Sequence, residues 1–166
     1  FINEEVLRII LDNMDSRSEG VVPVWKNGYI EPLLAVYKRK SILSKIDLDV
    51  FSMHDIVKKL KVKYLSVDVF RKVDPYLLSF LNVNSKKDVE YAKTMLGKEL
   101  DEIKKKVMKQ VNVPRSISDI SERIGEDTKI VAMIVEYLLW IGAVEEKNGK
   151  YILKKGFEKE EIQKLV

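Results

Sequence analysis

The sequence predicts an α/β protein built from two units, one over residues 1–97 and a small α+β unit over residues 98–166. In the first unit, helix-like apolar periodicity alternates with short β-branched runs, a pattern typical of sheets covered by helices. In the second, three helical stretches precede two apolar runs that flank Asn148-Gly149, the strongest short hairpin signal. Three helices followed by a hairpin is the element order of a winged helix.

The first predicted element is a helix that begins after Asn3, whose short side chain suits an N-cap position. Its apolar stripe consists of Val6, Leu7, Ile9, Ile10, Leu11 and Met14. Polar residues 15–20 then predict a loop, and residues 21–25 predict a strand. Pro23 favours the end of this strand or an edge position in the sheet, because proline cannot donate a ladder hydrogen bond.

A hairpin turn is predicted at Asn27-Gly28, so that residues 29–33 form a second strand antiparallel to the first. From residue 34 to residue 46 the pattern becomes helical. This stretch contains the basic cluster Lys38, Arg39 and Lys40, which we interpret as a solvated helix face. Contact with an anionic substrate is the alternative for the cluster.

Another helix is predicted to begin after Ser52, because Asp55 follows three residues later in a capping-box arrangement. Residues 62–70 alternate well enough for a strand. Two carboxylates, Asp68 and Asp74, lie near predicted strand ends. We interpret both as cap or turn residues rather than metal ligands, because a single Asp at such a place commonly has that role.

The most informative stretch joins an apolar strand, predicted over residues 77–81, to a helix capped by Ser85 with Asp88 in its first turn. Asn82 and Asn84 lie between them, where a strand ends and a helix begins. Ligands bind at this edge of open α/β sheets, and helix N-termini suit phosphate. An asparagine oxygen also suits a hard metal ion or a ribose hydroxyl. A plain turn is the alternative, because Asn is a common turn residue.

The helix after Ser85 is expected to end with Gly97 as its C-cap, and the second unit follows. Its helices are predicted at residues 99–111, 116–125 and 130–141, its hairpin at 143–153, and a charged helical tail at 157–166. The third helix is apolar nearly all round and therefore favours burial on more than one side. We expect a module for docking a protein partner or forming a homo-oligomer through residues 98–166. DNA binding through the hairpin lysines is the disfavoured alternative.

Composition excludes several classes of site. The chain has no cysteine and one histidine, His54, so disulfides, thiolate metal sites and His-rich metal sites are excluded. We interpret His54 as a surface residue. The net charge of +4 divides into +3 for residues 1–97 and +1 for the remainder, so a strongly basic nucleic-acid footprint is absent. No apolar run reaches transmembrane length, and we expect a cytoplasmic protein without a membrane partner.

Three segments resemble one enzyme family. The stretch from Phe80 to Asp88 is similar to the F-x-N-x-N-(T/S)-x-x-(D/E) signature that closes the catalytic domain of molybdenum cofactor guanylyltransferases. Residues 31–37 resemble the family's x-P-L-x-A-V-Y segment, and residues 21–23 its V-V-P strand end. The resemblance covers roughly residues 1–97 and implies the second half of a Rossmann-like nucleotidyltransferase sheet. The family's Gly-rich nucleotide loop and metal-binding Asp belong to the first half, which we expect upstream of Phe1; residues 1–166 alone are expected to be inactive.

The resemblance also implies an activity. Members of the family transfer GMP from GTP to molybdopterin with Mg²⁺ and release pyrophosphate. By this likeness, Asn84 would bind Mg²⁺ or phosphate, Asn82 would hold the loop or the substrate, and Pro32 would shape the pterin side. Two alternatives stay open: a related nucleotidyltransferase with another acceptor, and a non-catalytic regulator or adaptor that acts through the winged-helix-like unit by binding protein or DNA.

Overall fold

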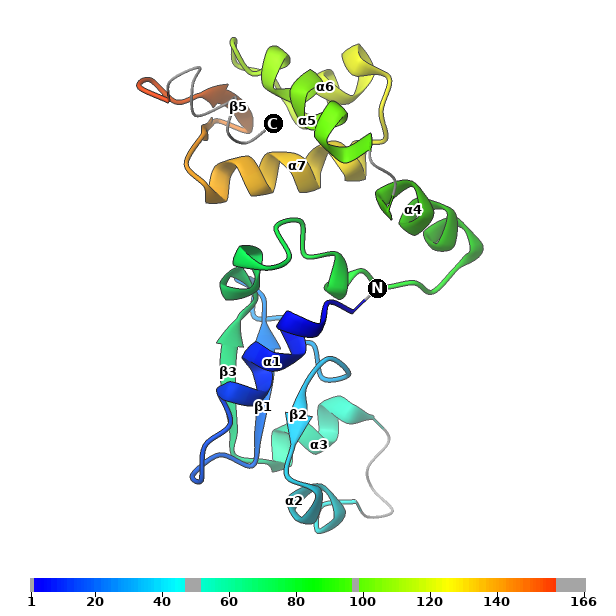
Figure 1. The fold of residues 1–166 in the computed structure, drawn as a ribbon, viewed down its shortest axis with the longest axis vertical. Helices are drawn as coiled ribbons and strands as arrows, with labels where there is room; N and C mark the ends of the chain where they lie inside the picture. The colour runs from blue at the N-terminus through cyan, green and yellow to red at the C-terminus, as the bar shows by residue number, and fades with distance from the viewer. Residues whose placement is uncertain (1, 47–51, 97–98, 158–166) are drawn as a thin grey trace. The chain divides into compact units, whose positions relative to one another are not determined.

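The computed structural model describes residues 2–46, 52–96 and 99–157, and the chain divides into two compact units, residues 1–81 and 82–166 (Figure 1). This division groups helix α4 (Lys86–Leu96) with the second unit. The sequence interpretation counted the same helix with the first unit, and its domain boundary at residue 97 stays a prediction.

The first unit contains a three-stranded sheet with β1 (Gly20–Val24) in the middle. On one side β2 (Val36–Tyr37) pairs antiparallel, and on the other β3 (Val62–Ser66) pairs parallel with all five residues of β1. Between β2 and β3 the chain forms two short helices, α2 (Arg39–Leu43) and α3 (Met53–Lys59). A parallel pair needs such a crossover, because its strands cannot be joined by a tight turn.

Helix α1 (Glu4–Asp12) covers β1, as Figure 1 shows, and begins as predicted, with the Asn3 side chain accepting a hydrogen bond from the Glu5 N–H at 2.9 Å. Its buried face contributes Val6 and Ile10 to the core. The rest of that core is Val21, Val67, Phe70, Leu77 and Phe80. Leu7 and Leu11 of the predicted apolar stripe remain exposed.

Two predictions for residues 29–46 are wrong. The turn at Asn27-Gly28 forms, with Gly28 at φ +85° and a single antiparallel bridge between Val24 and Ile30, but residues 29–33 make no strand. The strand paired with β1 is β2, inside the stretch predicted as helix, and only α2 is helical there. The physical reason is tertiary: an added Cβ on Gly20 would lie 2.7 Å from Cδ1 of Tyr37, so a glycine lets β2 pack closely on β1.

The prediction that Pro23 marks an end or an edge is correct for the end and wrong for the edge, because Pro23 is the last but one residue of β1 and β1 is the central strand of the sheet. The proline is tolerated because β2 pairs only with the first two residues of β1. Beside Pro23 lies the turn segment instead, and the Glu31 N–H donates to the Pro23 carbonyl at 2.9 Å. The missing proline N–H therefore faces a short turn rather than a continuous ladder.

The strand predicted over residues 62–70 is half correct, because β3 ends at Ser66 and a 3₁₀ helix, η1 (Val67–Lys72), follows. The strand predicted over residues 77–81 is wrong. That stretch contains a second 3₁₀ helix, η2 (Leu78–Phe80), preceded by Leu77 in the left-handed conformation at φ +56°. The expected strand end before Asn82 is thus a tight helical turn.

The second unit has the predicted order of elements. Helices α5 (Glu99–Gln110), α6 (Ile117–Ile124) and α7 (Thr128–Trp140) precede a hairpin of β4 (Val144–Lys147) and β5 (Lys150–Leu153). Gly125 ends α6 in the left-handed conformation, and both turn residues, Asn148 and Gly149, have positive φ. An isolated antiparallel bridge joins Arg115 to Tyr151.

Helix α7 is buried along most of its length, as its apolar composition predicts. Its buried residues are Ile130, Val131, Ile134, Val135 and Leu138. Figure 1 shows α7 beside α5 and α6 in this unit. None of the helices in the described ranges has the length and apolar character to span a membrane. The expected C-cap at Gly97 and the tail helix beyond residue 157 lie outside the described residues.

Candidate functional site

The candidate site residues Asn82 and Asn84 lie in an irregular segment, residues 82–85, directly before α4. Both asparagines are exposed to solvent. Within residues 2–46, 52–96 and 99–157, neither side-chain amide has a hydrogen-bond partner. Their donors and acceptors are therefore available to a ligand, and nothing in the local fold requires an amide at either position.

The predicted cap of α4 is confirmed and is more complete than its sequence suggests. Asp88 Oδ2 accepts hydrogen bonds from the N–H of Ser85 at 2.8 Å and the N–H of Asn84 at 3.1 Å. Ser85 Oγ accepts from the Asp88 N–H at 3.2 Å. Ser85 Oγ also donates to Asp88 Oδ2 at 2.8 Å, and this bond, followed by the backbone bonds, holds the pKa of the Asp88 carboxyl below its usual value. The segment is thus fixed by a reciprocal capping box.

This cap changes the chemistry expected of the helix start. The helix N-terminus was expected to offer free N–H groups that suit phosphate, but the N–H groups of Asn84 and Ser85 both donate to the Asp88 carboxylate. An ionised carboxylate at this point repels an anion and favours a cation or a hydroxyl group. The asparagine side chains, rather than the backbone, are therefore the groups that could contact a ligand here.

Magnesium fits these residues only in part. Mg²⁺ prefers oxygen ligands and usually keeps several waters, with one or two carboxylates and substrate phosphates completing its shell. Asn84 offers one amide oxygen, and Asp88, one helical turn away in sequence, offers a carboxylate. In the ranges the structure describes, no cluster of three or more His, Cys, Asp or Glu residues could hold a metal. The segment could thus supply a minor share of a magnesium shell.

The turn before the site is held by Asp74, which the sequence indicates only as a turn residue. Its carboxylate is buried, with 6% of the residue exposed. One oxygen accepts from the Leu78 N–H at 2.9 Å and the other from the Ser79 N–H at 2.7 Å. Asn3 adds a bond from its N–H to Ser79 Oγ at 3.0 Å. Asp74 therefore fixes η2, from which the chain leads to Asn82.

Pro32, the third candidate residue, is buried in the first unit, whereas Asn82 and Asn84 open the second. Its carbonyl oxygen accepts a hydrogen bond from the hydroxyl of Tyr37 at 2.8 Å. Burial raises the pKa of that tyrosine to about 12, so the hydroxyl keeps its proton at neutral pH. The helix expected after Pro32 is instead a bend leading to β2. Contact of Pro32 with a pterin stays a prediction.

No protein-family model matches this chain. Among curated proteins, it is 34% identical over 100 residues to the molybdenum cofactor guanylyltransferase of Desulfosudis oleivorans, a match that covers 58% of this chain and 48% of that protein. It is 30% identical over 112 residues to the probable molybdenum cofactor guanylyltransferase of Methanosarcina mazei, covering 58% and 46%. The chain thus spans about half the length of the relatives it matches.

A solved structure is similar to this chain over a comparable share of its length. The crystal structure of molybdopterin-guanine dinucleotide biosynthesis protein A from Archaeoglobus fulgidus is 28% identical, with a TM-score of 0.51. The match covers 57% of this chain and 50% of that one. The resemblance inferred from the three motifs and the mixed α/β fold are therefore confirmed: over somewhat more than half of its length, this chain is similar to molybdenum cofactor guanylyltransferases.

Proposed function

We propose that the protein containing this chain transfers GMP from GTP to molybdopterin and requires Mg²⁺. The observation that supports this proposal is the 34% identity, over 58% of the chain, with a molybdenum cofactor guanylyltransferase. The relatives are named as transferases in molybdenum cofactor biosynthesis. Because this chain spans about half of their length, the activity is proposed for the protein at its natural length, and the nucleotide loop of the other half would supply most contacts to GTP.

The reaction is a displacement at phosphorus. A phosphate oxygen of molybdopterin forms a bond to the α-phosphorus of GTP, the bond from that phosphorus to the bridging oxygen breaks, and pyrophosphate leaves with the electron pair. Such transfers ask the protein for alignment of two anions and for charge stabilisation rather than covalent chemistry. Bound Mg²⁺ would neutralise charge on the phosphate oxygens.

In this scheme, Asn84 contacts the metal ion or a phosphate, and Asn82 orients the substrate or the loop. Two observations support these roles: both side chains are exposed, and neither has a partner within the described residues. The Asp88 cap supports the metal over the phosphate for Asn84, because the carboxylate beside it favours positive charge. The amide of Asn82 can donate and accept at once, which suits a hydroxyl or a phosphate oxygen.

The acceptor is the least constrained part of the proposal. Pro32 would border the pterin, and its buried position beside Tyr37 makes it a rigid wall rather than a polar contact. A related nucleotidyltransferase with another acceptor remains the second candidate. The proposal places the protein in the cytoplasm, in keeping with a cysteine-free chain.

The second unit, by this proposal, docks a protein partner or a second copy of the chain. Helix α7 exposes Trp140, with 38% of its surface accessible, and the ring of Tyr137 stacks beside it at 6.3 Å between centroids. An aromatic pair at a helix end suits protein contact better than DNA contact, which needs polar side chains. Docking of a protein partner would also be needed in the alternative in which the unit acts as a regulator or adaptor by binding protein.

Replacing Asn84 with alanine in the natural-length protein tests the site. We expect Asn84→Ala to lower the rate of GMP transfer by about 10²-fold or more, because a contact at the reacting phosphates acts in the transition state. The matched control is Val83→Ala, at an exposed neighbouring position, for which we expect a near-normal rate. An unchanged circular dichroism spectrum shows that both variants fold. A near-normal rate for Asn84→Ala would remove this residue from the site.

A further inference from the structure

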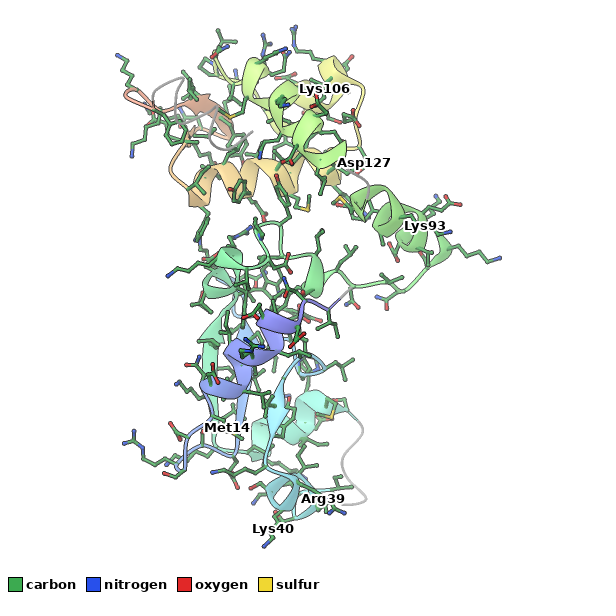
Figure 2. All side chains as sticks on the ribbon, in the orientation of Figure 1. Met14, Arg39, Lys40, Lys93, Lys106 and Asp127 are labelled. Carbon is green, nitrogen blue, oxygen red and sulfur yellow. The ribbon has the colours of Figure 1, made fainter. Side chains whose placement is uncertain are left out.

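A basic edge lies at one end of the sheet in the first unit. The parallel strands β1 and β3 start there, with Gly20 opposite Val62, and the antiparallel β2 ends there, with Tyr37 opposite Gly20. The residues that adjoin these three strand ends include six cations: Arg17, Lys38, Arg39, Lys40, Lys61 and Lys63. Figure 2 shows Arg39 and Lys40 at the same end of the unit as Met14, the residue that leads into the loop before β1. The strand topology thus gathers charges that are distant in sequence.

A hollow of about 310 Å³ opens at this edge. Its lining residues are Asp15, Arg17, Ser18, Lys61, Val62 and Lys63. The volume is at the lower end of the range for small-ligand sites, which begins at about 300 Å³. Three cations and one carboxylate line the hollow, so its own charge is about +2, in a chain whose net charge is +4.

Among the described residues, the cations of the hollow form no ion pair with a carboxylate. Lys63 Nζ donates to neutral oxygens of Asn13, the carbonyl at 3.2 Å and Oδ1 at 3.0 Å. The side chains of Arg17 and Lys61 have no hydrogen-bond or ion-pair partner in the part of the chain that the structure describes. Asp15 is occupied by its own loop, with Oδ1 accepting from the N–H groups of Arg17 at 2.8 Å and Ser18 at 2.7 Å.

Beside the hollow, Glu19 is similarly engaged, because it accepts the Lys61 N–H at 2.7 Å. Its pKa is lowered, first by that bond and further by the nearby charges of Lys45 and Lys38. The lysine Lys38 reaches over the loop and donates to the Ser16 carbonyl at 2.8 Å. Asp15 and Glu19 therefore both accept backbone N–H groups, while Arg17, Lys38 and Lys45 act on them as nearby charges.

We propose that this hollow is a binding site for a small phosphate-bearing anion. A guanidinium fork matches two phosphate oxygens, and lysine ammonium groups act as point charges beside it. A doubly or triply charged anion would offset the excess charge of the hollow, which a single carboxylate would not. The site lies at the amino ends of the parallel strands, and it does not involve residues 82–85 or rest on the proposed transfer reaction.

The test is a titration of isotope-labelled protein with inorganic pyrophosphate, followed by backbone amide signals in NMR spectra. We expect shifts that saturate at residues 15–18 and 61–63. Arg17→Gln combined with Lys61→Gln should weaken this binding by at least about tenfold, because two charge-assisted contacts are lost. The matched control, Lys72→Gln combined with Lys93→Gln, removes the same charge at exposed positions outside the hollow and should bind as the unmodified protein does.

Two further titrations identify the source of the phosphate. Saturable shifts with both pyrophosphate and AMP assign the site to phosphate groups in general, and shifts with pyrophosphate alone assign it to inorganic polyphosphate. Acetate at the same concentration should leave the hollow unaffected. The proposal is overturned if no shifts occur at residues 15–18 and 61–63, if acetate binds equally well, or if both double variants bind alike. Binding detected only elsewhere in the protein would also overturn it.

Discussion

Replacing the buried Asp74 with alanine should destabilise the first unit more than replacing a carboxylate in a more exposed loop, such as Asp15. The buried carboxylate accepts two backbone N–H groups, those of Leu78 and Ser79, at 2.9 and 2.7 Å. An unpaired buried N–H costs about 1–3 kcal/mol. Since alanine leaves space that water can partly enter, we expect a loss of about 2–4 kcal/mol for the two together.

The assay is urea unfolding followed by tryptophan fluorescence, because Trp25 packs against the core of this unit. In thermal unfolding, a loss of this size lowers the midpoint by roughly 12–24 °C for a unit of about 80 residues. The matched control is Asp15→Ala. Asp15 also accepts two backbone N–H groups, at 2.8 and 2.7 Å, but in a more exposed loop where water can replace it.

For Asp15→Ala we therefore expect a loss of about 1 kcal/mol or less. Asp74→Asn keeps one acceptor oxygen and should fall between the two alanine variants. The reasoning is refuted if Asp74→Ala loses less than about 1 kcal/mol, or if Asp15→Ala loses as much as Asp74→Ala. Either result would mean that burial does not determine how much the hydrogen bonds of Asp74 contribute to the free energy of unfolding.

Three further predictions concern the second unit. Trp140→Glu should lower the assembly mass measured by light scattering; a soluble protein of unchanged mass would contradict a role of α7 in docking. The pKa of Asp88 is lowered in the folded chain, so the stabilisation from its cap should be complete above the ordinary pKa of 3.8 and should be lost as the pH falls through the lower pKa of the folded chain. Faster amide exchange at Ser85 at low pH would show this loss. Asp88→Asn should abolish this pH dependence. Gly149→Ala should cost about 1 kcal/mol in urea unfolding, because Gly149 has φ +71°, and an unchanged midpoint would refute this.

Local signals in the sequence predicted the second unit well. The cap of α6 needs only Ser116 and Asp119, whose side chains and backbone bond reciprocally, and the hairpin needs only Asn148-Gly149. The same holds for the cap of α4 by Ser85 and Asp88. In each case the decisive hydrogen bonds join residues within four positions, so the pattern contains the physical cause.

Long-range contacts explain the failures in the first unit. The position of β2 depends on close packing of Tyr37 against Gly20, seventeen residues earlier, which no local pattern shows. The turn at η2 forms because a buried Asp74 captures the amides that a strand would have used. Asn82 and Asn84 could be identified by resemblance, and the capping box predicted the bond from the Ser85 N–H to Asp88, but no local pattern predicted the additional bond from the Asn84 N–H.

The measurement that tests the central claim most directly is transfer of label from GTP to molybdopterin by the natural-length protein. With GTP labelled at the α-phosphate and Mg²⁺ present, the account predicts labelled molybdopterin guanine dinucleotide and an equal amount of pyrophosphate, and much less product when CTP replaces GTP. Pyrophosphate release that needs a different acceptor would indicate another nucleotidyltransferase. No transfer from GTP to molybdopterin by folded protein would contradict the proposed function.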